Sequence, residues 1–179
     1  MSVPWVRLEL TVRTFDSARF TPYVDRCRAA GFSFTTLARL GDAEDARRRL
    51  YDLNKECSAD IPERGAFYSY EAYARLRFAS PSYDPAGIIV ARDQDGTWAG
   101  MAATSLHLSD GFAFNEMTGV RAPYRGRGIS LAMKTLGIAF ADHHGAPVIR
   151  TVHHPANTSA IAMNRTLGYV DADWHRDTP

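Results

Sequence analysis

The sequence has 179 residues, of which 45% are hydrophobic and 23% are charged, as expected of one globular domain with a substantial core. Its formal net charge of +1 at pH 7 creates no broad field that would attract nucleic acid or an anionic membrane, so neither is an expected partner. The N-terminus lacks the basic and apolar regions of a secretion signal, and no apolar run approaches the roughly 18 residues of a membrane span, so we expect a cytoplasmic protein.

The first 40 residues contain two strand-like segments around one helix-like segment. The stretch WVRLELTVR alternates like a strand, residues 17–30 have the spacing of an amphipathic helix that Gly31 ends, and FSFTTLARL is a second strand. We therefore predict an N-terminal β-α-β unit over residues 1–40.

Two helices with a polar loop between them are predicted next. Asp42 is placed to cap a helix that continues to about Glu56, and an aromatic-rich helix opens at Ser69 or Tyr70 and ends at Pro81. Two helices that flank a polar loop commonly form a lid over a substrate. For most residues of these helices, however, we expect only packing against the rest of the domain. The aromatic side chains of YSYEAYARLRF can line an acceptor pocket, but core packing suits most of them better.

Residues 87–120 carry the pattern of an antiparallel meander. Three apolar runs are joined by DQDG and SDG, and Asp-Gly turns between such runs are typical of hairpins. A helix from residue 129 to Gly145, the strand PVIRTVHH, the helix NTSAIAMNRTLG and the strand YVDADWH complete the chain. This order predicts an α/β fold with a mixed, mostly antiparallel sheet flanked by helices.

The turn YRGRGIS joins the meander to the following helix. Gly126 and Gly128 expose backbone N–H groups at the start of that helix, where the helix dipole favours an anion, so they predict a phosphate site. The turn ends without Gly-Lys-Ser/Thr and does not fit G-x-G-x-x-G, which disfavours a simple GTPase or a dinucleotide-binding protein.

The surroundings of this turn resemble the GNAT superfamily of acyl-CoA-dependent N-acyltransferases. The family pattern R/Q-x-x-G-x-G/A falls on Arg125, Gly128 and Ser130, and the second pattern, N-x-x-A, falls on Asn157 and Ala160, followed by LGY. The resemblance covers roughly residues 42–172, which we take as the core of one GNAT-like domain spanning residues 1–179.

The resemblance implies a binding site for acetyl-CoA or a related acyl-CoA. The pyrophosphate would lie on the backbone of residues 125–130, and the pantetheine arm would lie beside Thr118 and Val120 like an added strand, with Asn157 at the next helix N-terminus. The expected slot is a splay between the meander strand and VIRTVHH. The expected cofactor-binding residues are therefore Thr118, Val120, Arg125, Gly126, Arg127, Gly128, Ile129, Ser130 and Asn157.

Two positions depart from the family pattern. Ser130 replaces the usual Gly or Ala, and its hydroxyl can still cap the helix. Asn164 stands where the family often has a tyrosine thought to protonate the leaving thiolate. An amide cannot deliver that proton, so we expect Asn164 to hydrogen-bond the sulfur or the pantetheine. Either another acid serves, or the thiolate leaves largely unassisted.

Glu116 is the leading candidate for the general base, directly or through water. Strand alternation places it on the same face as Thr118 and Val120 unless a bulge intervenes, and an exposed or substrate-anchoring carboxylate is the alternative. His153 and His154 end the opposite strand and are candidates for an acid, a base or a substrate ligand.

No metal site is expected. His143, His144, His153 and His154 could contribute ligands in principle, but neighbouring strand residues point apart and no Cys or carboxylate pattern completes the set. Cys27 and Cys57 have neither metal-ligand spacing nor a disulfide framework, so we expect two reduced, buried thiols.

The resemblance implies an N-acetyltransferase in which a primary amine attacks the thioester of acetyl-CoA within a ternary complex. A small-molecule amine is the preferred acceptor, and a homodimer is possible. A non-catalytic acyl-CoA-binding regulator and an acetyltransferase for protein N-termini or lysines are the alternatives.

Overall fold

The computed structural model describes residues 4–174, and its centre is one seven-stranded sheet in the order β2-β3-β4-β5-β6-β1-β7. All neighbouring strands are antiparallel except β5 and β6, which are parallel. The strands are β1 (Val6–Thr11), β2 (Ser33–Thr36), β3 (Ile88–Arg92), β4 (Trp98–His107), β5 (Phe112–Val120), β6 (Val148–His153) and β7 (Val170–Asp171).

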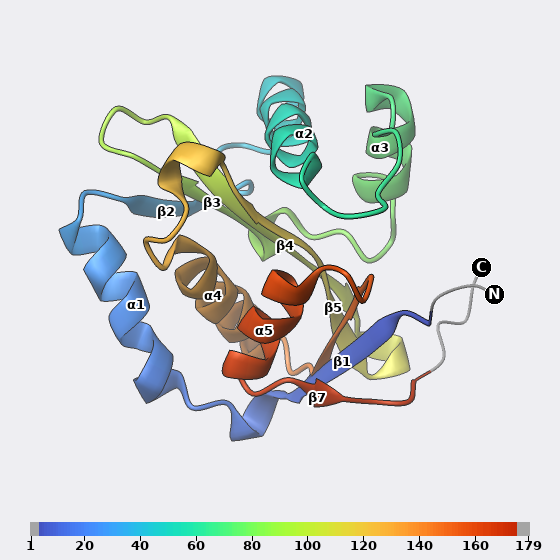
Figure 1. Cartoon of the computed structure of the whole chain (residues 1–179). Helices are drawn as coiled ribbons and strands as arrows, with labels where there is room; N and C mark the ends of the chain where they lie inside the picture. The colour runs from blue at the N-terminus through green and yellow to red at the C-terminus, as the bar shows by residue number, and fades with distance from the viewer. Residues whose placement is uncertain (1–3, 175–179) are drawn as a thin grey trace.

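Within residues 4–174, five α-helices cover the two faces of the sheet (Figure 1). α2 and α3 lie on one face, and α1, α4 and α5 lie on the other. Their bounds are α1 (Ser17–Ala29), α2 (Glu44–Ser58), α3 (Tyr70–Arg77), α4 (Ile129–His143) and α5 (Thr158–Thr166). The predicted mixed, mostly antiparallel sheet flanked by helices is therefore confirmed. No helix within residues 4–174 is long and apolar enough to cross a membrane.

The N-terminal strand, helix and strand form in the predicted order, but the second strand ends at Thr36 and the two strands lie far apart in the sheet. β1 is inserted between β6 and β7, whereas β2 forms the opposite edge beside β3. Leu8 and Leu10 of β1 are buried in the same hydrophobic cluster as Ile149 of β6 and Ile161 of α5. The segment thus contributes to the common sheet, with α1 packed against α4.

The meander over β3, β4 and β5 is confirmed, while two local predictions are wrong. Asp42 does not cap α2, because its carboxylate pairs with Arg47 at 2.7 Å and accepts a hydrogen bond from Tyr83, leaving Ala43 as the N-cap. The last strand, β7, covers only two residues of the predicted stretch YVDADWH, and His175 lies outside the described residues. α3 begins at Tyr70 as predicted, and the Ser69 hydroxyl caps it by accepting from the Ala72 N–H.

The parallel pair β5 and β6 is short and then opens into a fork. The two strands pair only at Ala113 with Ile149 and at Phe114 with Arg150. β5 continues to Val120 beside β4, so its second half leaves β6. The fold therefore contains the predicted splay between these strands, and it lies beside the turn that precedes α4.

Candidate active site

A groove of about 610 Å³ opens at the fork, within the size range of about 300–1,000 Å³ for small-molecule sites. Its walls come from the second half of β5, the turn before α4, α5, the end of α2 and one tyrosine of α1. The lining residues are Tyr23, Cys57, Asp60, Ile61, Met117, Thr118, Gly119, Val120, Arg125, Gly126, Gly128, Ser130, Leu131, Asn157, Ser159, Ala160, Met163 and Thr166.

The turn before α4 presents free backbone N–H groups to this groove. Gly126 and Gly128 have φ values of +76° and +77°, a region that L side chains rarely adopt. Gly128 is the N-cap of α4, and no side chain caps the helix. The predicted capping role of Ser130 is therefore wrong, because its hydroxyl makes no such bond. The uncapped N–H groups and the helix dipole suit an anion.

The two arginines of the turn have different surroundings. Arg125 borders the groove, where its Nε donates to the carbonyl of Val120 at 3.0 Å and its Nη1 pairs with Asp60 at 2.9 Å. The Arg127 side chain lies beside Phe32 and outside the groove lining, so only its backbone is available to the predicted site.

The predicted residues on β5 and α5 are also placed beside the groove. Thr118 and Val120 line it from β5, and Asn157 lines it at the N-cap of α5 without a side-chain cap hydrogen bond. Ile129 differs, because its side chain is 1% exposed within the core and only its backbone belongs to the turn. Seven of the nine predicted residues therefore line the groove, and the other two, Arg127 and Ile129, do not.

Several groove residues were not predicted, because no local motif identifies them. Tyr23 approaches from α1, and a Cβ at Gly128 would lie 3.1 Å from its ring. Cys57 and Asp60 come from the end of α2. Burial raises the pKa of Cys57 to about 12, so it remains a thiol at neutral pH and is unsuited to nucleophilic attack.

Glu116 lies at a β-bulge and faces away from Thr118. Ala103 of β4 pairs with Met117, and the next residue, Thr104, pairs with Asn115, which leaves Glu116 without a partner in the register. The extra residue reverses the alternation, so Glu116 faces the α2 and α3 side of the sheet. The expectation that Glu116 shares a face with Thr118 and Val120 is therefore wrong, because a bulge lies between Glu116 and these residues.

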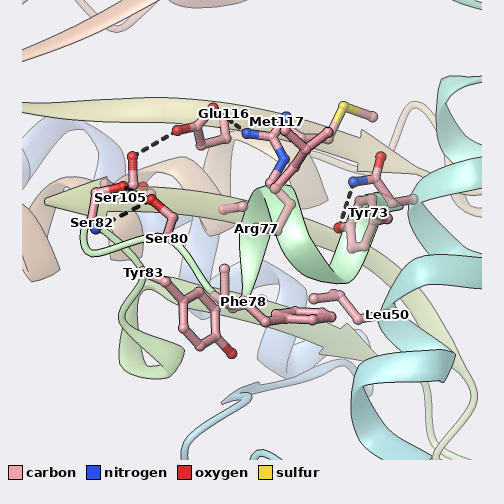
Figure 2. A pocket seen from close by; sticks show the side chains of 15 residues that line it. Leu50, Tyr73, Arg77, Phe78, Ser80, Ser82, Tyr83, Ser105, Glu116 and Met117 are labelled. Carbon is pink, nitrogen blue, oxygen red and sulfur yellow. Dashed lines mark hydrogen bonds and ion pairs between the residues drawn. The ribbon is translucent and has the colours of Figure 1, made fainter. Parts of the chain in front are cut away.

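The carboxylate of Glu116 is held by two donors (Figure 2). Arg77 Nη1 pairs with Oε2 at 2.6 Å, and Ser105 Oγ donates to Oε1 at 2.8 Å. Ser105 Oγ also lies 3.1 Å from His107 Nε2, which extends the network along β4. A carboxylate has about four lone-pair sites, so both oxygens can still accept from a bound amine or water.

Glu116 borders a second, smaller cavity of about 40 Å³ beneath α3. Arg77, Phe78 and Tyr83 are among the side chains that line it (Figure 2). Met117 lines both this cavity and the large groove. Met117 therefore stands between the two spaces at the bulge.

His153, which is half-buried, and Asn164, which is buried, bind each other and lie outside the groove lining. Asn164 is fully buried, and its Nδ2 donates to His153 Nε2 at 2.8 Å and to the Ala160 carbonyl at 2.9 Å. Its Oδ1 meets no hydrogen-bond partner within residues 4–174. Asn164 is absent from the groove lining, so its contact with a sulfur or the pantetheine stays a prediction that this arrangement does not support.

The same environment makes His153 a poor acid. Burial and then the charge of Lys134 lower the pKa of His153 to about 4, so its imidazole is neutral at pH 7 and its Nε2 accepts a hydrogen bond. His154 sits at the end of β6, where its Nδ1 accepts from the Ala156 N–H. Within the described part of the chain, no three His, Cys, Asp or Glu side chains are arranged to hold a metal ion.

One buried charged residue was missed by the sequence analysis. Lys134 of α4 is 2% exposed and donates to Asn115 Oδ1 at 2.8 Å. Burial lowers the pKa of Lys134 to about 7. The sequence did contain a hint of this burial, because Lys134 is the one charged residue in ISLAMKTLGIAFA, residues 129–141. Helical periodicity alone does not reveal whether such a lysine is buried or exposed.

The family model described as "Acetyltransferase (GNAT) family" matches residues 47–169. The chain belongs to the GNAT acetyltransferase family. Mycothiol acetyltransferase of Propionibacterium freudenreichii is 30% identical over 128 residues, which are 70% of this chain and 40% of that protein. This GNAT chain thus spans less than half the length of that curated relative.

Solved GNAT structures share the fold. A GCN5-related N-acetyltransferase from Sphaerobacter thermophilus has a TM-score of 0.67 and 18% identity, covering 94% of this chain and 48% of its own. Arabidopsis thaliana Naa50 in complex with the bisubstrate analogue CoA-Ac-MVNAL has a TM-score of 0.59 and 20% identity, covering 80% of this chain and 85% of its own. At these identities the likeness establishes the GNAT fold of the chain and leaves its substrates open.

Proposed function

We propose that this chain is an N-acetyltransferase that transfers an acetyl group from acetyl-CoA to a primary amine of a small molecule, by direct attack in a ternary complex. The observation that carries the proposal is the glycine turn, whose uncapped helix N-terminus opens into the groove at the β5–β6 fork. An anion site joined to a slot beside an unpaired strand edge suits a long ligand with a pyrophosphate at one end.

Each part of the groove then has a role. The backbone of residues 125–130 binds the pyrophosphate, and Arg125 exchanges Asp60 for a phosphate oxygen. The pantetheine lies along β5 beside Thr118 and Val120, with Asn157 contacting the arm. A backbone N–H near Val120 stabilises the oxyanion that forms when the amine attacks. No metal takes part in this proposal.

The amine reaches the thioester from the other face of β5. Met117 lies between the groove and the small cavity of Glu116, so its flexible side chain moves aside to let an amino group beside Glu116 reach the thioester. An alkyl amine has a pKa of about 10.4 and arrives protonated, so the reaction needs a base. Glu116 accepts that proton directly or through water, while the carbon–sulfur bond breaks and the electron pair leaves with the sulfur.

The groove assignment is tested by a pair of matched glycine variants. Gly126 borders the groove and Gly145 follows α4; their φ values are +76° and +75°, and a Cβ at either position meets no heavy atom within 4 Å. An alanine at either site therefore costs a similar roughly 1–2 kcal/mol of backbone strain. We expect Gly126→Ala to weaken acetyl-CoA binding by about tenfold or more, the effect of disturbing one hydrogen bond to a charged group.

Calorimetric titration with acetyl-CoA measures this difference, and Gly145→Ala should bind as wild type does. Equal affinities for both variants and the wild type would place the pyrophosphate elsewhere.

A size measurement in solution at the same protein concentration tests the predicted possibility of a homodimer.

Two other functions compete with this proposal. Asn164, at the position where GNAT proteins often have a tyrosine, favours a regulator that binds acyl-CoA without turnover. The peptide part of the analogue bound to Naa50 favours a protein N-terminus as acceptor. The relation to mycothiol acetyltransferase supports a small molecule instead. Incubation with acetyl-, propionyl- and succinyl-CoA, against separate pools of amines and peptides, distinguishes these functions and identifies the acyl group.

A further inference from the structure

Lys134 lies behind the fork without a compensating negative charge. No carboxylate within residues 4–174 forms an ion pair with it, and its Nζ lies 5.0 Å from the centre of the Tyr169 ring. A buried lysine without an acidic partner costs stability, and such costs are typical of functional sites. The mechanism proposed above leaves this lysine unused.

A short hydrogen-bonded chain connects Lys134 to the groove. Lys134 Nζ donates to Asn115 Oδ1 at 2.8 Å, and Thr118 Oγ1 donates to the same oxygen at 3.3 Å. Asn115 Nδ2 donates to the Ala103 carbonyl at 3.2 Å, which fixes the orientation of the amide. Thr118 lines the groove, so the amino group is two hydrogen bonds away from it.

We propose that Lys134 is a positioning residue of the acyl-transfer site: held against Asn115 behind Thr118, it places a buried positive charge behind the fork that stabilises the thiolate of CoA as it leaves. This inference rests on the proposed function. The amine nitrogen bonds to the carbonyl carbon, the carbon–sulfur bond breaks, and the electron pair stays on sulfur. The pKa of Lys134 is about 7 in the free protein, so the thiolate must raise this pKa and keep Lys134 protonated. That proton stays on Lys134, because Asn115 Oδ1 is an acceptor and cannot relay it to the sulfur.

The groups around Lys134 leave its charge unscreened. The titratable side chains placed against it are His153 from β6 and Tyr169, which follows α5. Burial raises the pKa of Tyr169 and lowers that of His153, so both are neutral near pH 7. In a poorly solvated interior a charge acts over several ångströms, which allows Lys134 to assist without touching the sulfur.

The test measures the pKa of the CoA thiol when CoA is bound, followed by the ultraviolet absorbance of the thiolate. Lys134→Met removes the charge at nearly constant side-chain length, and Lys55→Met removes the other lysine of the sequence, which is exposed on α2. We expect the bound thiol to titrate about one pH unit higher in Lys134→Met than in the wild type. Lys55→Met should match the wild type, and kcat of Lys134→Met should fall about tenfold.

A second measurement needs no variant. Because coupling between two sites is reciprocal, bound CoA thiolate should raise the pKa of Lys134, which NMR of isotopically labelled lysine detects. Equal thiol titrations in wild type and Lys134→Met, or a Lys134 titration that CoA does not change, would overturn this inference while leaving the acetyltransferase proposal intact. Failure of the wild-type protein to bind CoA would overturn both.

Discussion

Glu116→Gln is expected to lower kcat by about 10²–10⁴-fold, the usual contribution of a positioned general base. Glutamine keeps an oxygen that can accept from Ser105 or Arg77, so the local hydrogen bonds survive in part. It cannot take a proton from the attacking amine. The loss should therefore appear in kcat, while the affinity for acetyl-CoA stays close to that of the wild type.

The pH dependence of Glu116→Gln gives a sharper measure than a single rate. An alkyl amine becomes neutral in solution as the pH approaches about 10.4, and the variant then no longer needs a base. We expect its activity to rise with pH toward that of the wild type. Steady-state rates with a saturating amine, measured from neutral to alkaline pH, record this recovery.

Glu56→Gln is the matched control, because Glu56 also pairs with an arginine, Arg121, at 2.8 Å but lines neither the groove nor the Glu116 cavity. It should keep wild-type kcat. If Glu116→Gln retained full activity at every pH, Glu116 would not be the base. Its contact with Arg77 would then be structural.

Lys134→Met is expected to make the protein more stable at pH 6 by several kcal/mol. Burial lowers the pKa of Lys134 from 10.5 in the unfolded chain to about 7. Since one pH unit corresponds to about 1.4 kcal/mol, the penalty for burying the charged lysine below pH 7 is on the order of 5 kcal/mol. Methionine removes that penalty and loses the hydrogen bond to Asn115, which contributes about 1 kcal/mol.

The sign of the pH dependence follows from proton binding. Between pH 7 and 10.5 the unfolded chain holds a proton on Lys134 that the folded protein has released, so wild-type stability rises with pH over this window. The advantage of Lys134→Met should therefore be largest below pH 7 and shrink as the pH approaches 10.5. Urea unfolding at several pH values measures it.

Lys55→Met serves as the control, since an exposed lysine should change stability by no more than about 0.5 kcal/mol. A Lys134→Met protein that is less stable than wild type at pH 6 would contradict the prediction. A stability difference that does not change with pH would do so as well, because it would mean that Lys134 does not lose its proton on folding.

The sequence predicted most of the fold because its patterns are local. Apolar alternation and Asp-Gly turns identified the meander, and Gly126 and Gly128 identified the glycine turn before α4, where we predict the anion site. Each of these features depends on residues close together in the chain. The two GNAT patterns are also short and local, and all of their fixed residues line the groove.

The errors concern features that depend on distant residues. The bulge that turns Glu116 away from Thr118 is defined by the register of β4 against β5. The burial of Asn164 and Lys134 depends on how α4 and α5 pack against β5 and β6. Asp42 lost its cap role because Tyr83, far along the chain, binds its carboxylate together with the nearby Arg47. No spacing along the chain specifies these contacts.

The most direct test of the account is transfer of an isotopically labelled acetyl group from acetyl-CoA to pooled primary amines, followed by mass spectrometry. The account predicts a labelled amide and free CoA in equal amounts, with formation of both reduced in Glu116→Gln. Binding of acetyl-CoA with no labelled amide from any amine or peptide would contradict an acetyltransferase and favour a regulator.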